Sequence, residues 1–369
     1  MFKTFIKIAA IVVTGYYIWI FAILPVLTGA AKAIFYRPPK ATPVYGLLDP
    51  LEFVEKSTTK STPKYSLNTK NGKLPNNFPT VMPVYKFKAK PFSYLASDNA
   101  IKDAEYLGFT EENLITDLKG TIFRWRNPVS GTILEIDKDS RRLDQTTNLT
   151  GKSQDFVAGV INEENAKEKA IDLFKALSRF NDTLYPKGFQ TVIFGGYSGS
   201  RMVETTASRD AVVAKVDLFR KVGDYVILGP DPKKALLSVV LRANTPSNSQ
   251  KVLNYPIIDA NYTEIESTTQ ATYPIISVNQ AWKAVQNGQG IVTNVTPSDT
   301  NPFEDSQQAS LEDVLIDNVY LAYYESIKTE KFLQPIYVFE GKYTSGSSAG
   351  GSISIYFPAV TGEYVKKTQ

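Results

Sequence analysis

The chain has 369 residues and a formal net charge of +4, and it contains neither cysteine nor histidine. These absences exclude disulfide frameworks, Cys/His zinc sites and every nucleophilic triad that uses histidine. Aromatic residues make up 12% of the chain and charged residues only 21%, which predicts a packed core rather than global disorder. Length alone predicts two or three domains.

Positive charge is concentrated in the first quarter of the chain. Residues 1–95 contain twelve lysines and one arginine against three carboxylates, Asp49, Glu52 and Glu55, which gives this part a net charge of +10 and the remainder −6. A basic arm before a mildly acidic body indicates either contact with an anionic surface or a solvated, lysine-rich linker.

An uncharged stretch runs from Ile8 to Ala31 and is flanked by lysines. About 20 apolar residues span a bilayer core as a helix, so residues 8–31 predict a transmembrane anchor in contact with the lipid bilayer. A cleaved signal peptide is the alternative, because Ala31-Lys32-Ala33 has the small residues of a cleavage site, although such peptides have a shorter apolar region. The anchor residues expected in the bilayer are Ile8, Ile11, Val12, Tyr16, Tyr17, Trp19, Phe21, Leu24 and Leu27.

The orientation of this anchor does not follow from the flanking charges, which are balanced on the two sides. The Tyr- and Thr-rich, strand-rich composition and the size of the C-terminal part favour an exported body. The predicted location is therefore the cell membrane, with a single pass and an extracytoplasmic C-terminal body.

Composition and periodicity divide the chain into five segments. The anchor, residues 1–36, is followed by a Pro/Ser/Thr/Lys-rich tether over residues 37–80, whose composition buries too little apolar surface to fold alone. Three modules follow, over residues 81–150, 151–260 and 261–369, each with a capped helix and then strands of period-two alternation. This order predicts an α+β fold of antiparallel sheets with a helix packed on one face.

One helix is predicted in each module. The first begins at Ser97 and the second at Asn162, both as N-caps, and the third begins at Ser277 with a capping box to Gln280. The predicted strands cover residues 121–126, 132–136, 191–194, 212–219, 225–228, 236–241, 318–324, 336–339 and 353–357.

The last module carries a family resemblance. After its capped helix come the runs Tyr320-Leu321-Ala322-Tyr323-Tyr324, Leu333-Gln334-Pro335-Ile336-Tyr337-Val338-Phe339-Glu340-Gly341 and Pro358-Ala359-Val360-Thr361-Gly362-Glu363. Residues 276–364 thereby resemble the C-terminal part of YycH/YycI-type membrane-anchored extracytoplasmic regulators, and more loosely the PepSY module. The run Val129–Ile136 in the first module is similar.

This resemblance implies a bacterial envelope protein whose outer part binds a partner rather than catalysing a reaction. In the YycH/YycI family that partner is a sensor kinase that controls the cell wall. The middle module, residues 161–260, departs from the family and leaves the partner open. The family supplies no catalytic residue to carry over.

Two S-x-x-K motifs, Ser57–Lys60 and Ser61–Lys64, and the S-D-N motif Ser97-Asp98-Asn99 are typical of penicillin-binding proteins and serine β-lactamases. Both S-x-x-K copies lie in the tether, and Pro63 interrupts the second. Since no K-T-G strand follows, we interpret these motifs as surface residues and a helix cap.

The other candidate motifs also favour structural explanations. The acidic stretch has neither calcium-loop spacing nor a pair of carboxylates that the sequence places together, so it is interpreted as a solvated loop. It comprises Asp299, Glu304, Asp305, Glu312, Asp313 and Asp317. The glycine-rich runs 195–201 and 345–352 lack the strand–loop–helix context of a phosphate site and predict hairpin loops. In Arg124-Trp125-Arg126, alternation places Trp125 on the opposite sheet face from the arginines, so no nucleic-acid partner is predicted.

No catalytic, cofactor-binding or metal-binding residue is therefore predicted, and no binding-surface residue is assigned. The leading hypothesis is a non-enzymatic, extracytoplasmic protein that binds another membrane or envelope protein and regulates a cell-envelope sensor or the cell-wall machinery. The alternatives are a carboxylate-dependent cell-wall hydrolase and a structural surface or tether protein.

Overall fold

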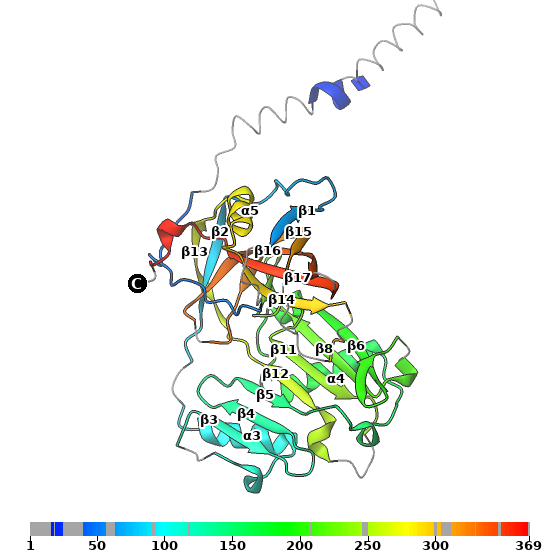
Figure 1. Cartoon of the computed structure of the whole chain (residues 1–369). Helices are drawn as coiled ribbons and strands as arrows, with labels where there is room; N and C mark the ends of the chain where they lie inside the picture. The colour runs from blue at the N-terminus through cyan, green and yellow to red at the C-terminus, as the bar shows by residue number, and fades with distance from the viewer. Residues whose placement is uncertain are drawn as a thin grey trace, which may run out of the picture. The chain divides into compact units, whose positions relative to one another are not determined.

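The computed structural model describes residues 16–17, 19–24, 40–56, 63–90, 93–116, 119–206, 208–245, 250–298, 301–303, 311–328, 330–345 and 348–367. The chain divides into two compact units, Met1–Lys40 and Ala41–Gln369. The second unit contains two large β-sheets, one of eight and one of nine strands (Figure 1).

The described part of the first unit does not contain the predicted membrane span. Among the described residues, no helix combines the length and the apolar composition needed to cross a bilayer. The described helical residues here are Tyr16, Tyr17, the stretch η1, Trp19–Ile23, and Leu24, and most of residues 8–31 lie outside the described ones. The prediction of an N-terminal transmembrane helix is therefore not supported by the described residues. Of the anchor residues, Tyr16, Tyr17, Trp19, Phe21 and Leu24 are described and solvent-exposed, and Ile8, Ile11, Val12 and Leu27 lie outside the described residues.

The eight-stranded sheet is antiparallel and has the order β3-β4-β5-β12-β11-β8-β6-β7. Its strands are β3 (Ile122–Arg126), β4 (Ile133–Asp137), β5 (Leu143–Thr146), β6 (Phe189–Ser198), β7 (Arg201–Glu204), β8 (Val213–Phe219), β11 (Leu237–Arg242) and β12 (Ile257–Ala260). Alternation buries Phe123 and Trp125 of β3 on one face and exposes Arg124 and Arg126 on the other, as predicted. The buried face packs against two helices, α3 (Ala96–Leu107) and α4 (Glu163–Ala176), in one apolar core.

The N-terminal cap of α4 follows from local side-chain chemistry, whereas the start of α3 does not. Asn162 caps α4, with its side-chain oxygen accepting a hydrogen bond from the Asn165 backbone N–H at 2.7 Å. Helix α3 begins two residues earlier than a Ser97 cap predicts, and its N-cap, Leu95, makes no side-chain capping bond. The Ser97 prediction is therefore wrong. The helix ends as expected at Gly108, which adopts a left-handed φ of 94°.

The nine-stranded sheet has the central order β13-β2-β16-β15-β10-β9, with β1 added beside β15 and with β17 placed between β16 and β14. Its strands are β1 (Lys64–Leu67), β2 (Val81–Phe87), β9 (Lys221–Val222), β10 (Tyr225–Leu228), β13 (Ile265–Pro274), β14 (Ile291–Pro297), β15 (Asp313–Tyr324), β16 (Phe332–Ser345) and β17 (Ser348–Pro358). Helix α5 (Val278–Gln286) begins with the predicted Ser277–Gln280 capping box and buries Trp282 against Phe339 of β16.

The predicted α+β class is also wrong, because the chain folds mainly as β-sheet. Strands assigned to separate modules join common sheets: β2 pairs with β13 and β16, β10 runs parallel to β15, and β5 pairs with β12. Period-two alternation identifies a strand but not its partner, and these partners lie far away in the sequence. Local patterning therefore could not show that each sheet combines strands from more than one predicted module.

The predicted tether is bound to the body over much of its length. Leu48 is fully buried, forms a parallel bridge to Val365, and belongs to a small core with Tyr273 and Val360. Farther along, Phe53 packs edge-on against Tyr324 at a ring-centroid distance of 4.7 Å. A few apolar side chains are enough here, because the sheet already provides the surface that they cover.

Candidate functional site

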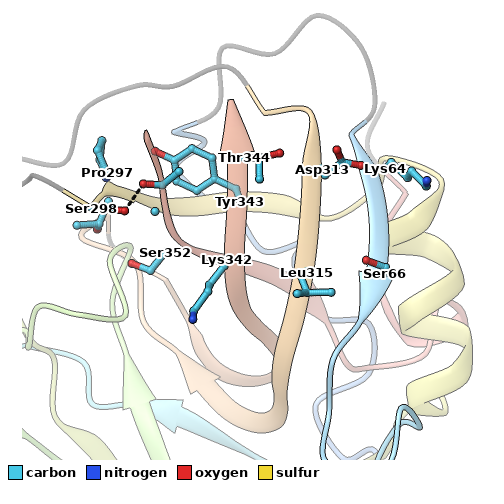
Figure 2. A pocket seen from close by; sticks show the side chains of 13 residues that line it. Lys64, Ser66, Pro297, Ser298, Asp313, Leu315, Lys342, Tyr343, Thr344 and Ser352 are labelled. Carbon is cyan, nitrogen blue, oxygen red and sulfur yellow. Dashed lines mark hydrogen bonds between the residues drawn. The ribbon is translucent and has the colours of Figure 1, made fainter. Parts of the chain in front are cut away.

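A groove of about 930 Å³ lies at one end of the nine-stranded sheet (Figure 2). Five strands line it: β1, β15, β16, β17 and β14. The residues of this groove are Lys64, Ser66, Thr296, Pro297, Ser298, Asp313, Leu315, Lys342, Tyr343, Thr344, Gly350, Gly351 and Ser352. Its volume lies at the upper end of the range of about 300–1,000 Å³ typical of ligand pockets.

Strand register places the floor residues in one row. Ser66 is opposite Leu315, Leu315 is opposite Lys342, Lys342 is opposite Ser352, and Ser352 is opposite Thr296. Residues directly opposite each other on neighbouring strands share a sheet face, and Figure 2 shows Lys342, Ser352, Leu315 and Ser66 side by side. The row thus brings together side chains separated by up to 286 positions in the sequence, from Ser66 to Ser352.

Glycine allows the strands to approach closely at the rim. A Cβ atom on Gly351 would lie 2.1 Å from the backbone oxygen of Thr296 in β14, and one on Gly350 would lie 2.1 Å from that of Tyr343 in β16. Neither position can take a side chain without moving the neighbouring backbone. The glycine-rich run of the sequence therefore forms a close-packed wall of the groove, with Ser298 donating a backbone hydrogen bond to Gly350 at 3.0 Å.

The groove carries more positive than negative charge. Lys64 and Lys342 are exposed, and neither forms an ion pair with a described residue. Asp313 is the single carboxylate among the described lining residues, and it lies opposite Lys64 on the neighbouring strand. At its inner margin the Lys233 ammonium donates to the Ser352 hydroxyl. Burial lowers the pKa of Lys233, while the charges of Asp231 and Glu340 oppose that shift. Ammonium and hydroxyl donors therefore dominate the surface.

Toward the sheet centre the same face becomes apolar. Tyr320 donates to the Glu340 carboxylate at 2.9 Å, and Tyr356 donates to the backbone oxygen of Gly229 at 3.1 Å inside a buried cluster. Burial and the Glu340 charge raise the pKa of Tyr320, so its hydroxyl stays protonated and remains a donor. The groove is thus closed at its inner end by packed core.

Some lining residues of the groove belong to motifs that are visible in the sequence, although no motif predicted the groove itself. Lys64, from the second S-x-x-K motif, and Asp313, from the acidic stretch, both line it, as does the end of the glycine-rich run. Asp317 instead accepts from the Asn68 side chain at 2.7 Å. Ser57, Lys60 and Ser61, and likewise Asp299, Glu304 and Asp305, lie outside the described residues. The sequence offered no signal for Lys342, whose position depends on strand pairing.

A second polar feature lies on the face of the eight-stranded sheet that is turned away from α3 and α4. Asp144 of β5 and Asp259 of β12 are register partners. Asp144 accepts from the Asn261 amide at 2.6 Å, and the Lys234 ammonium lies 2.7 Å from Asp259. Burial, reinforced by the neighbouring Asp259 carboxylate, raises the pKa of Asp144 to about 7. The pair lies on a sheet face rather than in the groove.

Within the described residues, no group of three or more His, Cys, Asp or Glu side chains is arranged to hold a metal ion. Asp144 and Asp259 are occupied by Asn261 and Lys234, and the buried carboxylates Asp182 and Glu325 by Arg220. These acidic groups therefore have structural partners.

Comparison with known proteins gives weak structural similarity. No family model and no curated protein matches the chain. A crystal structure of an uncharacterized protein from Eubacterium rectale ATCC 33656 is similar over 79% of this chain and 87% of that chain, with a TM-score of 0.42 and 13% sequence identity.

Proposed function

We propose that this chain is a non-enzymatic binding protein whose groove holds an extended, acidic segment of a partner protein. The observation that carries the proposal is the row of the groove floor, where lysine and hydroxyl side chains from four strands face one open hollow. Such donors suit carboxylate groups and the carbonyl oxygens of an extended backbone.

Charge favours an acidic segment over a neutral one. Lys64 and Lys342 approach from β1 and β16, and Asp313 offsets only one of them. Thr344 and Ser352 add hydroxyl groups, which can donate and accept hydrogen bonds, whereas the Ser66 and Ser298 hydroxyls already donate to the backbone oxygens of Val314 and Gly350. Strand β1 also offers an edge for binding. Among the described residues it pairs only with β15, so an extended segment of the partner can add as a strand on its other side.

The groove fits binding better than carboxylate hydrolysis. Glycoside hydrolysis uses two carboxyl groups about 5–10 Å apart, and the described lining contributes only Asp313. The resemblance of residues 276–364 to YycH/YycI-type regulators supports the same reading, and on that basis we propose a partner in the cell envelope, outside the cytoplasm.

The direct test is binding of a fluorescein-labelled octapeptide with Glu-Ser repeated four times, followed by fluorescence polarisation. We expect the wild-type chain to bind it and the Lys64→Ala/Lys342→Ala double variant to bind about tenfold more weakly, since two exposed charge pairs together contribute about 1.4 kcal/mol. The matched control is Lys102→Ala/Lys169→Ala, which removes two exposed lysines from α3 and α4.

Two outcomes would contradict the proposal. Equal weakening by the control variant would show that the peptide responds to net charge alone, and equal binding of a Lys-Ser octapeptide would remove the electrostatic argument. Release of soluble sugar or peptide from bacterial cell-wall material by the purified chain would instead support the hydrolase alternative.

A further inference from the structure

A separate pocket of about 190 Å³ lies between α3, the short helix η2 (Glu111–Asn113) and β3. Its floor is apolar and buried: Phe109 and Trp125 are 1% and 2% exposed. Ile101 and Leu114 form half-buried walls. The volume is that of a single large side chain and is too small for an extended peptide.

Local structure holds this pocket open in a fixed shape. Gly108 ends α3 in the left-handed conformation and turns the chain so that Phe109 points back into the core. Thr110 then caps η2, donating from its backbone N–H to the Asn113 side-chain oxygen at 3.0 Å. Leu114 forms an antiparallel bridge to Trp125, and the chain therefore returns along the edge of β3.

The rim of the pocket is acidic. Glu105, one turn beyond Ile101 on α3, and Glu111 of η2 both line it and are solvent-exposed. No described lysine or arginine forms an ion pair with either carboxylate.

We infer that this pocket is a docking site for a basic protein segment, which inserts one apolar side chain between Phe109, Trp125 and Leu114. Lysine or arginine residues on either side of that anchor pair with Glu105 and Glu111. A buried apolar anchor surrounded by complementary charge is the arrangement that concentrates binding energy in protein interfaces. The site is independent of the groove, whose charge is of the opposite sign.

The probe is the fluorescein-labelled pentapeptide Lys-Lys-Leu-Lys-Lys with the purified full chain, followed by fluorescence polarisation. We expect replacement of its leucine by alanine to weaken binding about tenfold, because the pocket then loses most of the buried apolar area. The Glu105→Gln/Glu111→Gln variant should weaken binding of the leucine peptide by a similar factor. Both protein changes are at exposed positions, so the fold is retained.

The control variant is Glu112→Gln/Glu168→Gln, which removes two exposed carboxylates that do not line the pocket. It should bind the leucine peptide as the wild type does. Equal binding of the leucine and alanine peptides would overturn the inference, since charge alone would then account for the affinity. Wild-type affinity in the Glu105→Gln/Glu111→Gln variant would overturn it as well.

Discussion

Arg220, directly after β8, and Glu325, directly after β15, form a buried ion pair that joins the eight-stranded to the nine-stranded sheet. The two residues are 2% and 1% exposed. Arg220 also pairs with Asp182, donates to the Thr263 backbone oxygen at 2.8 Å, and lies over the Tyr262 ring at 5.1 Å. Burial would by itself lower the pKa of Arg220, but the carboxylates raise it above its ordinary value, so the guanidinium stays charged.

Replacing Arg220 by methionine should destabilise the protein strongly. The change leaves the Asp182 and Glu325 carboxylates buried without their cation, and removing one partner of a buried pair costs about 3–5 kcal/mol. Urea unfolding at neutral pH measures this loss. The control, Arg209→Met, removes an arginine whose side chain is 85% exposed, and it should change the free energy of unfolding by no more than about 0.5 kcal/mol. If Arg220→Met lowers the free energy of unfolding as little as the control does, the ion pair of Arg220 with Glu325 does not hold the sheets together.

Stability should depend on pH through Asp144. Its pKa rises from 3.8 to about 7 on folding, so the folded state binds the proton more tightly, and the resulting stability is lost as the pH rises through 7. Between pH 4 and pH 8, the free energy of unfolding of the wild type should fall by on the order of 2 kcal/mol more than that of Asp144→Asn. Urea midpoints for both proteins across this range test the prediction. Asp139→Asn, at an exposed turn, should leave the wild-type pH profile unchanged.

The groove wall should be sensitive to a single methyl group. The Gly351→Ala change would place a Cβ atom against the Thr296 backbone oxygen. Because this overpacks the contact between the strands, we expect the free energy of unfolding to fall by about 1–3 kcal/mol. Gly362→Ala is the control, because a Cβ atom there meets nothing within 4 Å. Thermal unfolding of the two variants compares them directly, and equal midpoints would mean that β14 and β17 can separate without loss.

Two adjacent leucines test whether residues 41–56 are bound to the body. Leu48 is fully buried and Leu47 is 53% exposed. We expect Leu48→Ala to lower the free energy of unfolding by about 2–4 kcal/mol and Leu47→Ala to change it by less than about 0.5 kcal/mol. Denaturant unfolding measures both. Equal, small effects would show that this segment is a free tether after all.

Features that depend on nearby residues were predictable from the order of amino acids. The Asn162 cap, the Ser277–Gln280 capping box and the Gly108 helix end follow from side chains and backbone conformations within one turn. The alternation Phe123-Arg124-Trp125-Arg126 likewise indicated which side of β3 is buried. Composition was sufficient to exclude the classes of chemistry that require cysteine or histidine.

The remaining features depend on tertiary contacts, because strand partners lie far apart in the chain. The apolar stretch from Ile8 to Ala31 satisfied a length rule for a membrane helix, but no helix among the described residues is long and apolar enough to be one. Lys64, Asp313, Lys342 and Ser352 share a groove only through the pairing of β1, β15, β16 and β17. The ion pair of Arg220 with Glu325 spans 105 positions for the same reason. No local pattern specifies such register, since it is set by which apolar faces pack together when the two sheets form.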